Sequence, residues 1–246
     1  MILPLAIAFR DESKPANGAW MSLALLGSLS LLELLPRRDD KALGWTADAV
    51  DTTLELGSAN VATPAGYHRT ALKRSKPSAP LRHLQSAHPD LIRGKVLDYG
   101  SGRGQDCATL QAHCYDPHHP QREVRRQPSG KYDTVLMTYV LNVLPQRQRA
   151  QALRQARDRV ASGGVMILTV RGTQDTGYQA AKRWTPHGDG YAKHTPAGKL
   201  KRFQRFYASA DQLHQWAAPI VGRAFERVAL QPLTSDSVMI AYQRKR

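Results

Sequence analysis

The feature that most constrains this chain is a glycine-rich turn between a short apolar strand and a helix. The strand, Val96–Leu97, stops at an acid, Asp98, and a helix is predicted to begin at Asp106. Glycine occupies every second position of the turn: Gly100, Gly102 and Gly104. Because glycine has no Cβ, it adopts positive φ and lets backbone N–H groups approach a ligand. The N-terminal amides of the helix point at the same place, so the pattern predicts a nucleotide-type binding turn.

Two aspartates indicate which ligand this turn would hold. The glycine spacing differs from the Gly-x-Gly-x-x-Gly pattern that binds a pyrophosphate, and Asp98 would repel a pyrophosphate but suits an ammonium group. Asp116 ends a second short apolar segment. An acid at the end of such a strand can accept hydrogen bonds from both ribose hydroxyls of an adenosine. A ligand with a ribose and a cationic amino-acid tail is S-adenosylmethionine. The alternative is that both aspartates only cap helices or turns.

With these motifs in this order, the chain resembles the class I S-adenosylmethionine-dependent methyltransferases from about Tyr67 onward. The resemblance implies an α/β, Rossmann-like fold with a mostly parallel sheet and a C-terminal antiparallel hairpin, here Phe225–Leu230 and Val238–Tyr242. Only sixteen residues separate Asp116 from the next apolar run, Asp133–Met137. The third strand should therefore be shortened or missing, with residues 123–125 as its only trace.

Other elements are predicted from caps and periodicity. A helix over Pro80–Ala87 should be capped by Ser78, and Gln212–Ala218 should form another helix. A helix over Gln146–Ala161 should present its arginines outward and end at the glycines of residues 162–164.

The cofactor site is predicted from the carboxyl ends of the strands. Asp98 and the turn would hold the methionine end, Asp116 the ribose, and Asn142 the floor near the reacting methyl. The predicted cofactor residues are Asp98, Tyr99, Gly100, Ser101, Gly102, Gly104, Asp106, Asp116, Pro117 and Asn142. Tyr139 and Asn142 are the candidate catalytic residues. No catalytic base is identified, and alignment of the acceptor with the methyl would supply much of the acceleration.

Positive charge gathers in the second part of the chain. The net charge is +15; residues 1–65 contribute −3, and residues 66–246, with thirty Lys/Arg against twelve Asp/Glu, contribute +18. Such a surface favours a polyanionic partner, although a solvated basic surface is the alternative. An insertion at about 172–210 combines cations with rings and suits phosphates and bases, while Phe203 and Phe206 could instead be core residues of a covering helix. The predicted nucleic-acid contacts are Arg69, Lys73, Arg171, Lys201, Arg202, Gln204 and Arg205.

A closer resemblance rests on a combination of short segments. These are His68–Ala71, Leu97–Asp106, Tyr115–Pro117, Tyr139–Val143 and Arg202–Arg205. Together they resemble the methyltransferases associated with DNA phosphorothioation systems and their phage relatives, which implies a DNA-related setting. We therefore expect methyl transfer to a nucleic acid, with DNA as the favoured substrate. A small-molecule or protein methyltransferase, or a non-catalytic cofactor-sensing DNA-binding module, remain as alternatives.

The methyltransferase domain is predicted to cover residues 66–246, after a helical extension in residues 1–65. The leucine-rich run Ala19–Leu35 is short of the ~20 apolar residues of a membrane span and contains a glutamate. We therefore predict no stable membrane insertion, and a helix that packs on the domain or mediates homo-oligomer formation.

The cysteine content bears on compartment and metal binding. Cys107 and Cys114 are predicted to be separate, inert core residues in a reducing compartment, which indicates a cytoplasmic protein. Their spacing to nearby histidines matches no zinc finger or ribbon, so no metal is predicted.

Overall fold

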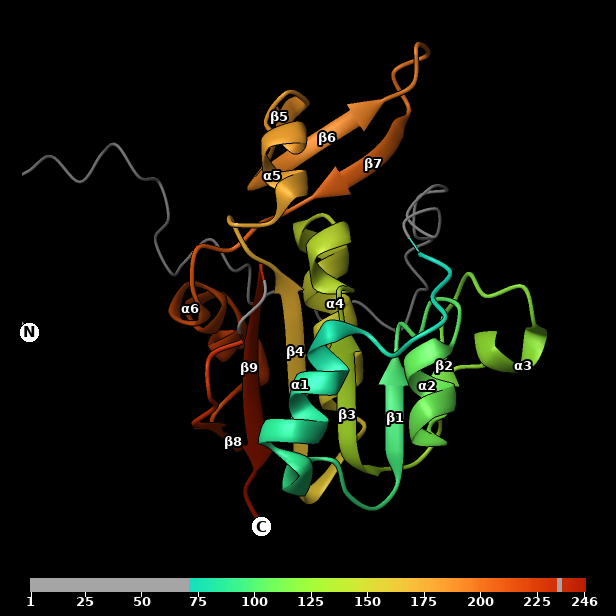
Figure 1. Cartoon of the computed structure of the whole chain (residues 1–246), viewed down its shortest axis with the longest axis vertical. Helices are drawn as coiled ribbons and strands as arrows, with labels where there is room; N and C mark the ends of the chain where they lie inside the picture. Colours follow the sequence, from blue (N-terminus) through green and yellow to red (C-terminus); the bar gives the residue numbers. More distant parts are fainter. Residues whose placement is uncertain (1–70, 234–235) are drawn as a thin grey trace, which may run out of the picture. The chain divides into compact units, whose positions relative to one another are not determined.

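The computed structural model describes residues 71–233 and 236–246 (Figure 1). Its main feature is a six-stranded sheet in the order β2-β1-β3-β4-β9-β8. The strands are β1 Val96–Tyr99, β2 His113–Tyr115, β3 Tyr132–Thr138, β4 Val160–Arg171, β8 Phe225–Val228 and β9 Ser237–Arg244. The first four pair in parallel, and β9 runs antiparallel to both β4 and β8. The α/β fold with a C-terminal antiparallel hairpin is confirmed.

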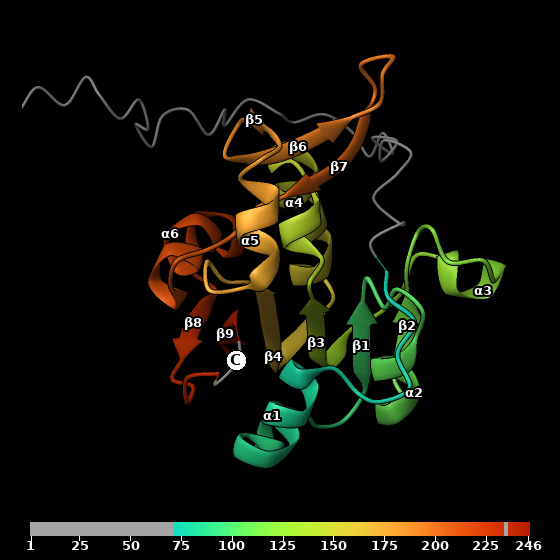
Figure 2. The same ribbon diagram turned by 45° about the horizontal axis from the view of Figure 1, so that its top comes forward.

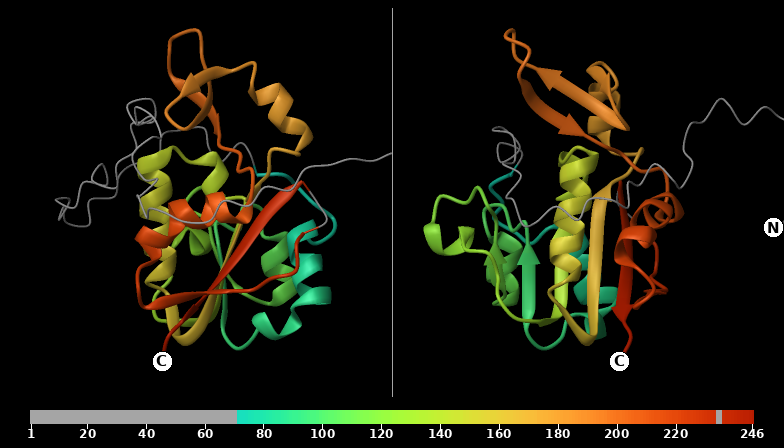
Figure 3. Two further views of the ribbon diagram at one scale, coloured as in Figure 1. Left: turned by 90° about the vertical axis from the view of Figure 1, so that its left-hand side faces the viewer. Right: turned by 180° about the vertical axis from the view of Figure 1, so that it is seen from behind.

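Helices cover both faces of this sheet (Figure 3, left). On one face lie α1 Ala79–Ala87, the 3-10 helix η4 Pro89–Leu91 and α2 Gln105–Leu110; on the other lie α4 Gln146–Arg157 and α6 Ala210–Val221. Successive strand residues alternate between the two cores. In β3, Val135 and Met137 belong to the larger cluster with α4 and α6, whereas Leu136 packs with Leu84 of α1. Ser78 caps α1 as predicted, accepting a hydrogen bond from the Leu81 N–H.

The connection after β2 lacks a strand. In the described part of the chain no strand lies beyond β2, which leaves it at the sheet edge. The predicted loss of the third strand is therefore confirmed. The expected trace of that strand is wrong, because residues 122–125 form the short helix α3, Arg122–Arg125.

Two predictions about the segment after β3 are wrong. Helix α4 ends at Arg157, and the glycines of residues 162–164 lie inside β4 rather than ending a helix. The pairing with β3 shifts there, and Gly163 has φ +72°, so these residues form a bulge in which glycine is suited to the backbone. Arg149, expected to face solvent, is fully buried.

The insertion after β4 is folded (Figure 2). It contains α5 Thr176–Ala181 and a three-stranded antiparallel sheet: β5 Thr185–His187, β6 Gly190–His194 and β7 Leu200–Gln204. This small sheet lies beyond the end of the main sheet at which β1 and β3 finish. Phe203 and Phe206 are buried, but they belong to β7 and the residues after it, so the alternative of a covering helix is wrong.

The N-terminal predictions lie outside the described residues. These include the helical extension, the leucine-rich run and Arg69. Within the described residues, no helix combines the length and apolar character needed to cross a membrane.

Candidate functional site

A pocket opens at the carboxyl ends of β1, β2 and β3. Most of its lining comes from the glycine-rich turn, the end of β2, the segment after β3 and one face of α4. Ala71, Leu72 and Arg74 before α1, and Gln127 of the connection after β2, also line it. Eight of the ten predicted cofactor residues line it: Asp98, Tyr99, Gly100, Ser101, Gly102, Asp106, Asp116 and Pro117. The β1–turn–α2 unit and the β2 acid are thus brought together at one site, as expected for an open parallel sheet.

The turn depends on glycine for two reasons. Gly100, Gly102 and Gly104 all have positive φ, between +59° and +85°. A Cβ on Gly100 would also lie 2.3 Å from a methyl of Val140, on the segment after β3. The backbone N–H groups of Gly100 and Ser101 donate to the Tyr115 carbonyl at 2.6 and 2.9 Å, which ties the turn to β2.

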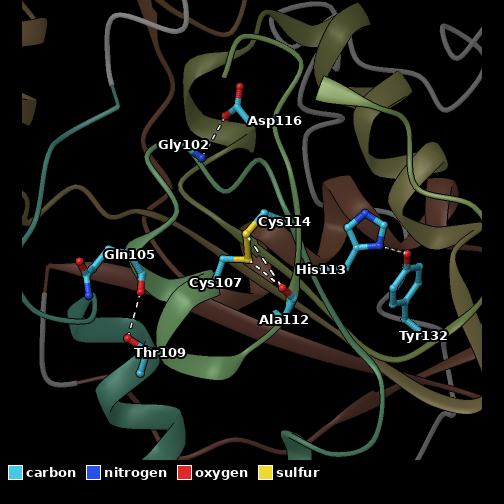
Figure 4. Close-up of a disulfide and its surroundings, with 9 residues drawn as sticks. All are labelled: Gly102, Gln105, Cys107, Thr109, Ala112, His113, Cys114, Asp116 and Tyr132. Carbon is cyan, nitrogen blue, oxygen red and sulfur yellow. Dashed lines mark hydrogen bonds between the residues drawn. A yellow bond between two sulfur atoms is a disulfide. The ribbon is translucent and has the colours of Figure 1, made fainter. Parts of the chain in front are cut away.

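Asp116 is held in a fixed orientation beside the turn (Figure 4). One carboxylate oxygen accepts from the Gly102 N–H at 3.0 Å, and the other accepts from the His118 N–H at 2.8 Å. The aspartate therefore does cap a turn, as the alternative predicted. A carboxylate offers about four lone-pair positions, so two remain for the hydroxyls of a ligand.

Asp98 is a buried acid among other acids. Its side chain is 2% exposed, and its pKa is raised to about 7 by burial first and then by Asp106 and Asp116, while Arg74 opposes the rise. Asp106 accepts a hydrogen bond from the Ser78 N–H at 2.7 Å. Three carboxyl groups around one pocket favour a ligand that carries positive charge. Arg74 also lines the pocket and lies over the Tyr139 ring at 5.8 Å.

Tyr139 lines the pocket in a conformation that non-glycine residues rarely adopt. Its φ is +60°, and strained backbone of this kind tends to cluster at functional sites. Its hydroxyl shares a 2.8 Å hydrogen bond with the Ser237 hydroxyl, and burial raises its pKa. The phenol is therefore protonated at neutral pH and can donate a hydrogen bond but is a poor base.

Asn142, expected at the floor of the site, does not line the pocket. It is fully buried in the 3-10 helix η5 Leu141–Val143, and its amide donates to the Gln204 side chain at 3.1 Å. The Asn142 carbonyl accepts from the Arg205 N–H at 2.8 Å. Its position therefore links β7 of the insertion to the segment that lines the pocket. Gly104, at the start of α2, also lies outside the lining.

The six predicted nucleic-acid contacts that the structure describes fall into two groups. Lys73, Lys201 and Arg202 are exposed and do not line the pocket. The others are held within the protein: Arg171 is paired with Asp175 at 2.9 Å, and Arg205 donates to the Asp189 carbonyl at 2.7 Å. Gln204 is held by Asn142.

Comparison with known proteins decides the family. A family model described as a methyltransferase domain matches residues 62–219. The chain belongs to this family. It is an S-adenosylmethionine-dependent class I methyltransferase, and its cofactor is S-adenosylmethionine. A comparison with curated proteins gave no match.

Solved structures similar to this methyltransferase share little sequence with it. The S-adenosylmethionine-dependent methyltransferase SibL, in its apo form, is 17% identical with a TM-score of 0.46. The match covers 74% of this chain and 66% of SibL. The Burkholderia thailandensis 1,6-didemethyltoxoflavin-N1-methyltransferase is 17% identical with a TM-score of 0.46, over 69% of this chain and 79% of that one. The CcbJ methyltransferase from Streptomyces caelestis is 16% identical with a TM-score of 0.43. The match covers 73% of this chain and 95% of CcbJ.

The pocket of this methyltransferase has features that fit its cofactor. The acids around Asp98 suit the cationic amino-acid end, and Asp116 has capacity for ribose hydroxyls. A Cβ on Gly104 would meet no atom within 4 Å, so the turn leaves space above α2. The carboxylates and the turn are therefore compatible with S-adenosylmethionine.

Replacing Asp116 by alanine is expected to weaken S-adenosylmethionine binding by ~1–3 kcal/mol, because the ribose hydroxyls would be left without their acceptor. Isothermal titration calorimetry measures the change. Asp90→Ala, at an exposed acid in η4 outside the pocket, serves as the control and should bind like the wild type. Unchanged affinity in Asp116→Ala would exclude this carboxylate from the cofactor site.

Sequence reasoning missed a buried ion pair in this methyltransferase. Arg149 of α4 donates to Asp189, and its guanidinium lies over the Trp216 ring at 4.7 Å. Arg205 adds a second cation 3.8 Å from the same carboxylate. The pair joins the insertion to the core. One indication of this pair was present in the sequence: Arg149 falls on the apolar side of α4, whereas other arginines of that helix do not.

The cysteine prediction is wrong. Cys107 of α2 and Cys114 of β2 form a disulfide, with their Cα atoms 5.7 Å apart (Figure 4). Their spacing in sequence gave no indication that the two side chains face each other. The cytoplasmic assignment, which assumed free thiols, loses that support. Among residues 71–233 and 236–246, no three His, Cys, Asp or Glu side chains gather as a metal site would need.

Proposed function

We propose that this methyltransferase transfers a methyl group from S-adenosylmethionine to a nucleic acid, with DNA as the expected substrate. The observation that carries the proposal is the charge of the insertion between β4 and α6. Its two acids, Asp175 and Asp189, are both engaged in ion pairs with arginines. Its exposed charges are all positive: Lys182, Arg183, Lys193, Lys199, Lys201 and Arg202.

Two of these cations face each other across a strand pair. Lys193 of β6 lies directly opposite Arg202 of β7, and both are exposed. Like charges directly opposite each other destabilise a sheet, and a bound phosphate would relieve the repulsion. The neighbouring positions Ala192 and Phe203 point the other way and are buried, so the cationic positions share the outer face.

The insertion is attached to the segment that lines the cofactor pocket. The contacts between Asn142 and Gln204, and between the Asn142 carbonyl and the Arg205 N–H, join β7 to η5. Val140 and Val143, on either side of Asn142, line the pocket. A polyanion on the insertion would therefore be bound by an element anchored directly to the cofactor site.

The chemistry requires little from the protein beyond positioning. S-adenosylmethionine supplies a methyl group on a sulfonium, which is already a strong electrophile. Asp98 would hold the ammonium group, Asp116 the ribose, and Tyr139 could donate a hydrogen bond to the acceptor. Alignment of an acceptor atom with the methyl would supply most of the acceleration. The resemblance to phosphorothioation-associated methyltransferases supports DNA as the acceptor.

The proposal predicts salt-dependent nucleic-acid binding that depends on the insertion. Fluorescence anisotropy with a labelled DNA duplex should show log affinity falling steeply with log salt concentration. Lys193→Gln/Arg202→Gln should weaken binding and make the slope shallower by about 2, roughly one for each phosphate that is no longer neutralised. Unlabelled RNA and single-stranded DNA as competitors would identify the preferred nucleic acid.

The control removes the same charge elsewhere. Arg223→Gln/Lys245→Gln changes two exposed cations outside the insertion and should leave the slope within experimental error of wild type. Absence of binding at low salt would contradict a nucleic-acid substrate and favour a small-molecule or protein acceptor. An equal loss in both double variants would mean that the insertion is not the contact surface.

A further inference from the structure

We propose that Gln148 and Gln151 of α4 bind the hydrogen-bonding edge of the adenine ring of S-adenosylmethionine. This inference concerns recognition of the cofactor and is independent of the methyl acceptor. It starts from the missing third strand. Because no strand lies beyond β2 in the described residues, no neighbouring strand end is available to recognise a base beside Asp116. Besides Pro117, His118 and Gln127 of the connection after β2, α4 contributes residues to the pocket.

Three glutamines of α4 line the pocket. Gln148, Gln151 and Gln155 recur at intervals of three and four, which places them on one face of the helix. Gln155 is already engaged, because its side-chain oxygen accepts from the Tyr99 hydroxyl at 2.6 Å. The Gln148 and Gln151 side chains are half-buried and have no hydrogen-bond partner among the described residues. Partly buried amides of this kind favour a polar ligand.

Apolar side chains in the lining of the pocket suit a flat ring. Val143 and Leu144 line it from the segment before α4, and Tyr115 lines it from β2. The Tyr115 ring lies 4.8 Å from the Tyr99 ring, which in turn contacts Gln155. The lining therefore includes apolar side chains and two amides on and near α4, in addition to the carboxylates that would suit the charged tail.

The chemistry of the two amides matches adenine. The adenine edge presents an amino donor beside a ring-nitrogen acceptor, and a glutamine side chain presents a carbonyl acceptor beside an amino donor. A bidentate contact of this type discriminates between bases by roughly 5- to 150-fold. Methionine has nearly the same shape and helix propensity but offers no comparable hydrogen bonds, so Gln→Met isolates the polar contribution.

The test is a thermodynamic cycle that combines a substitution in the protein with the removal of one group from the ligand. Calorimetry would measure binding of S-adenosylhomocysteine and of its analogue in which hydrogen replaces the adenine amino group. Wild-type protein should bind the first about 10-fold more tightly, and Gln148→Met/Gln151→Met should bind both about equally. Gln146→Met, at an exposed position of the same helix, should retain the wild-type preference.

The ratio of the two affinities decides the outcome. A preference that survives in Gln148→Met/Gln151→Met would overturn the proposal, even if both affinities fell. The single variants Gln148→Met and Gln151→Met, checked by thermal unfolding, keep the ratio measurable if the double variant folds or binds poorly. No nucleic acid enters the assay, so failure here is distinguishable from failure of the proposed function.

Discussion

Replacing Asp98 by asparagine is expected to weaken S-adenosylmethionine binding at least ~100-fold at pH 8. An effect of this size is expected because the substitution leaves the buried ammonium charge of the ligand without its partner. The carboxyl group is nearly inaccessible, and Asp106 and Asp116 already surround it. Only the ionised form attracts an ammonium group strongly. Asparagine keeps the shape of the side chain but removes this attraction, so the loss reports on charge rather than on packing.

The same substitution should stabilise the cofactor-free protein at high pH. The pKa of Asp98 is about 7 in the folded protein, against about 3.8 ordinarily, so the folded state binds this proton more tightly than the unfolded state. The resulting stability is present below pH 4 and is lost as the pH rises to about 7. A pKa difference of about three corresponds to about 4 kcal/mol. Asp98→Asn should therefore raise the melting temperature at pH 8 far more than at pH 5.

Wild-type binding should itself depend on pH through the same group. Below pH 7 the ligand must displace a proton from Asp98, so affinity should fall up to about tenfold for each unit of pH, with close to one proton released on binding. Calorimetry in buffers of different ionisation enthalpy measures that release. Affinity that is constant between pH 5.5 and 8, or unaltered in Asp98→Asn, would contradict the assigned role.

Arg149→Met is expected to destabilise the protein by ~3–5 kcal/mol, because it leaves Asp189 without its buried partner. Arg149 is fully buried, pairs with Asp189 and lies over Trp216. Arg205 compensates only in part, since its guanidinium is 3.8 Å from the Asp189 carboxylate. Urea unfolding monitored by circular dichroism gives the difference in free energy.

Two further variants test the reason for this loss. Arg154→Met removes an exposed arginine from the same helix and should change stability by less than ~0.5 kcal/mol. Arg149→Met/Asp189→Asn removes both charges and should recover part of the lost stability. If Arg149→Met unfolds like Arg154→Met, the ion pair does not hold the insertion to the core.

The cofactor pocket was largely predictable because its signals are local. Glycines at positive φ and an acid at a strand end depend on a few adjacent residues, and Gly100, Gly102 and Asp116 lie where the pattern placed them. The missing third strand followed from length alone. The fold class was predictable for the same reason, because each parallel strand was a short apolar run ending at a turn.

The predictions that failed depended on distant contacts. Arg149 resembles its exposed neighbours in sequence, and only the approach of Asp189, forty residues away, explains its burial. Asn142 follows a strand end, as a site residue would, yet Gln204 of the insertion holds its side chain away from the pocket. The disulfide likewise required knowing how α2 packs against β2.

The most direct test of the whole account is methyl transfer itself. The whole chain would be incubated with S-adenosylmethionine carrying a trideuterated methyl group and, in parallel reactions, with genomic DNA, total RNA, a protein fraction or a small-molecule extract. Nucleosides from the digested nucleic acids, and the other two fractions, would be analysed by mass spectrometry. We predict a labelled methylnucleoside that is absent with Asp98→Asn and retained with Gln146→Met. DNA and RNA that stay unlabelled, while a small-molecule extract or protein fraction acquires the label, would contradict the account.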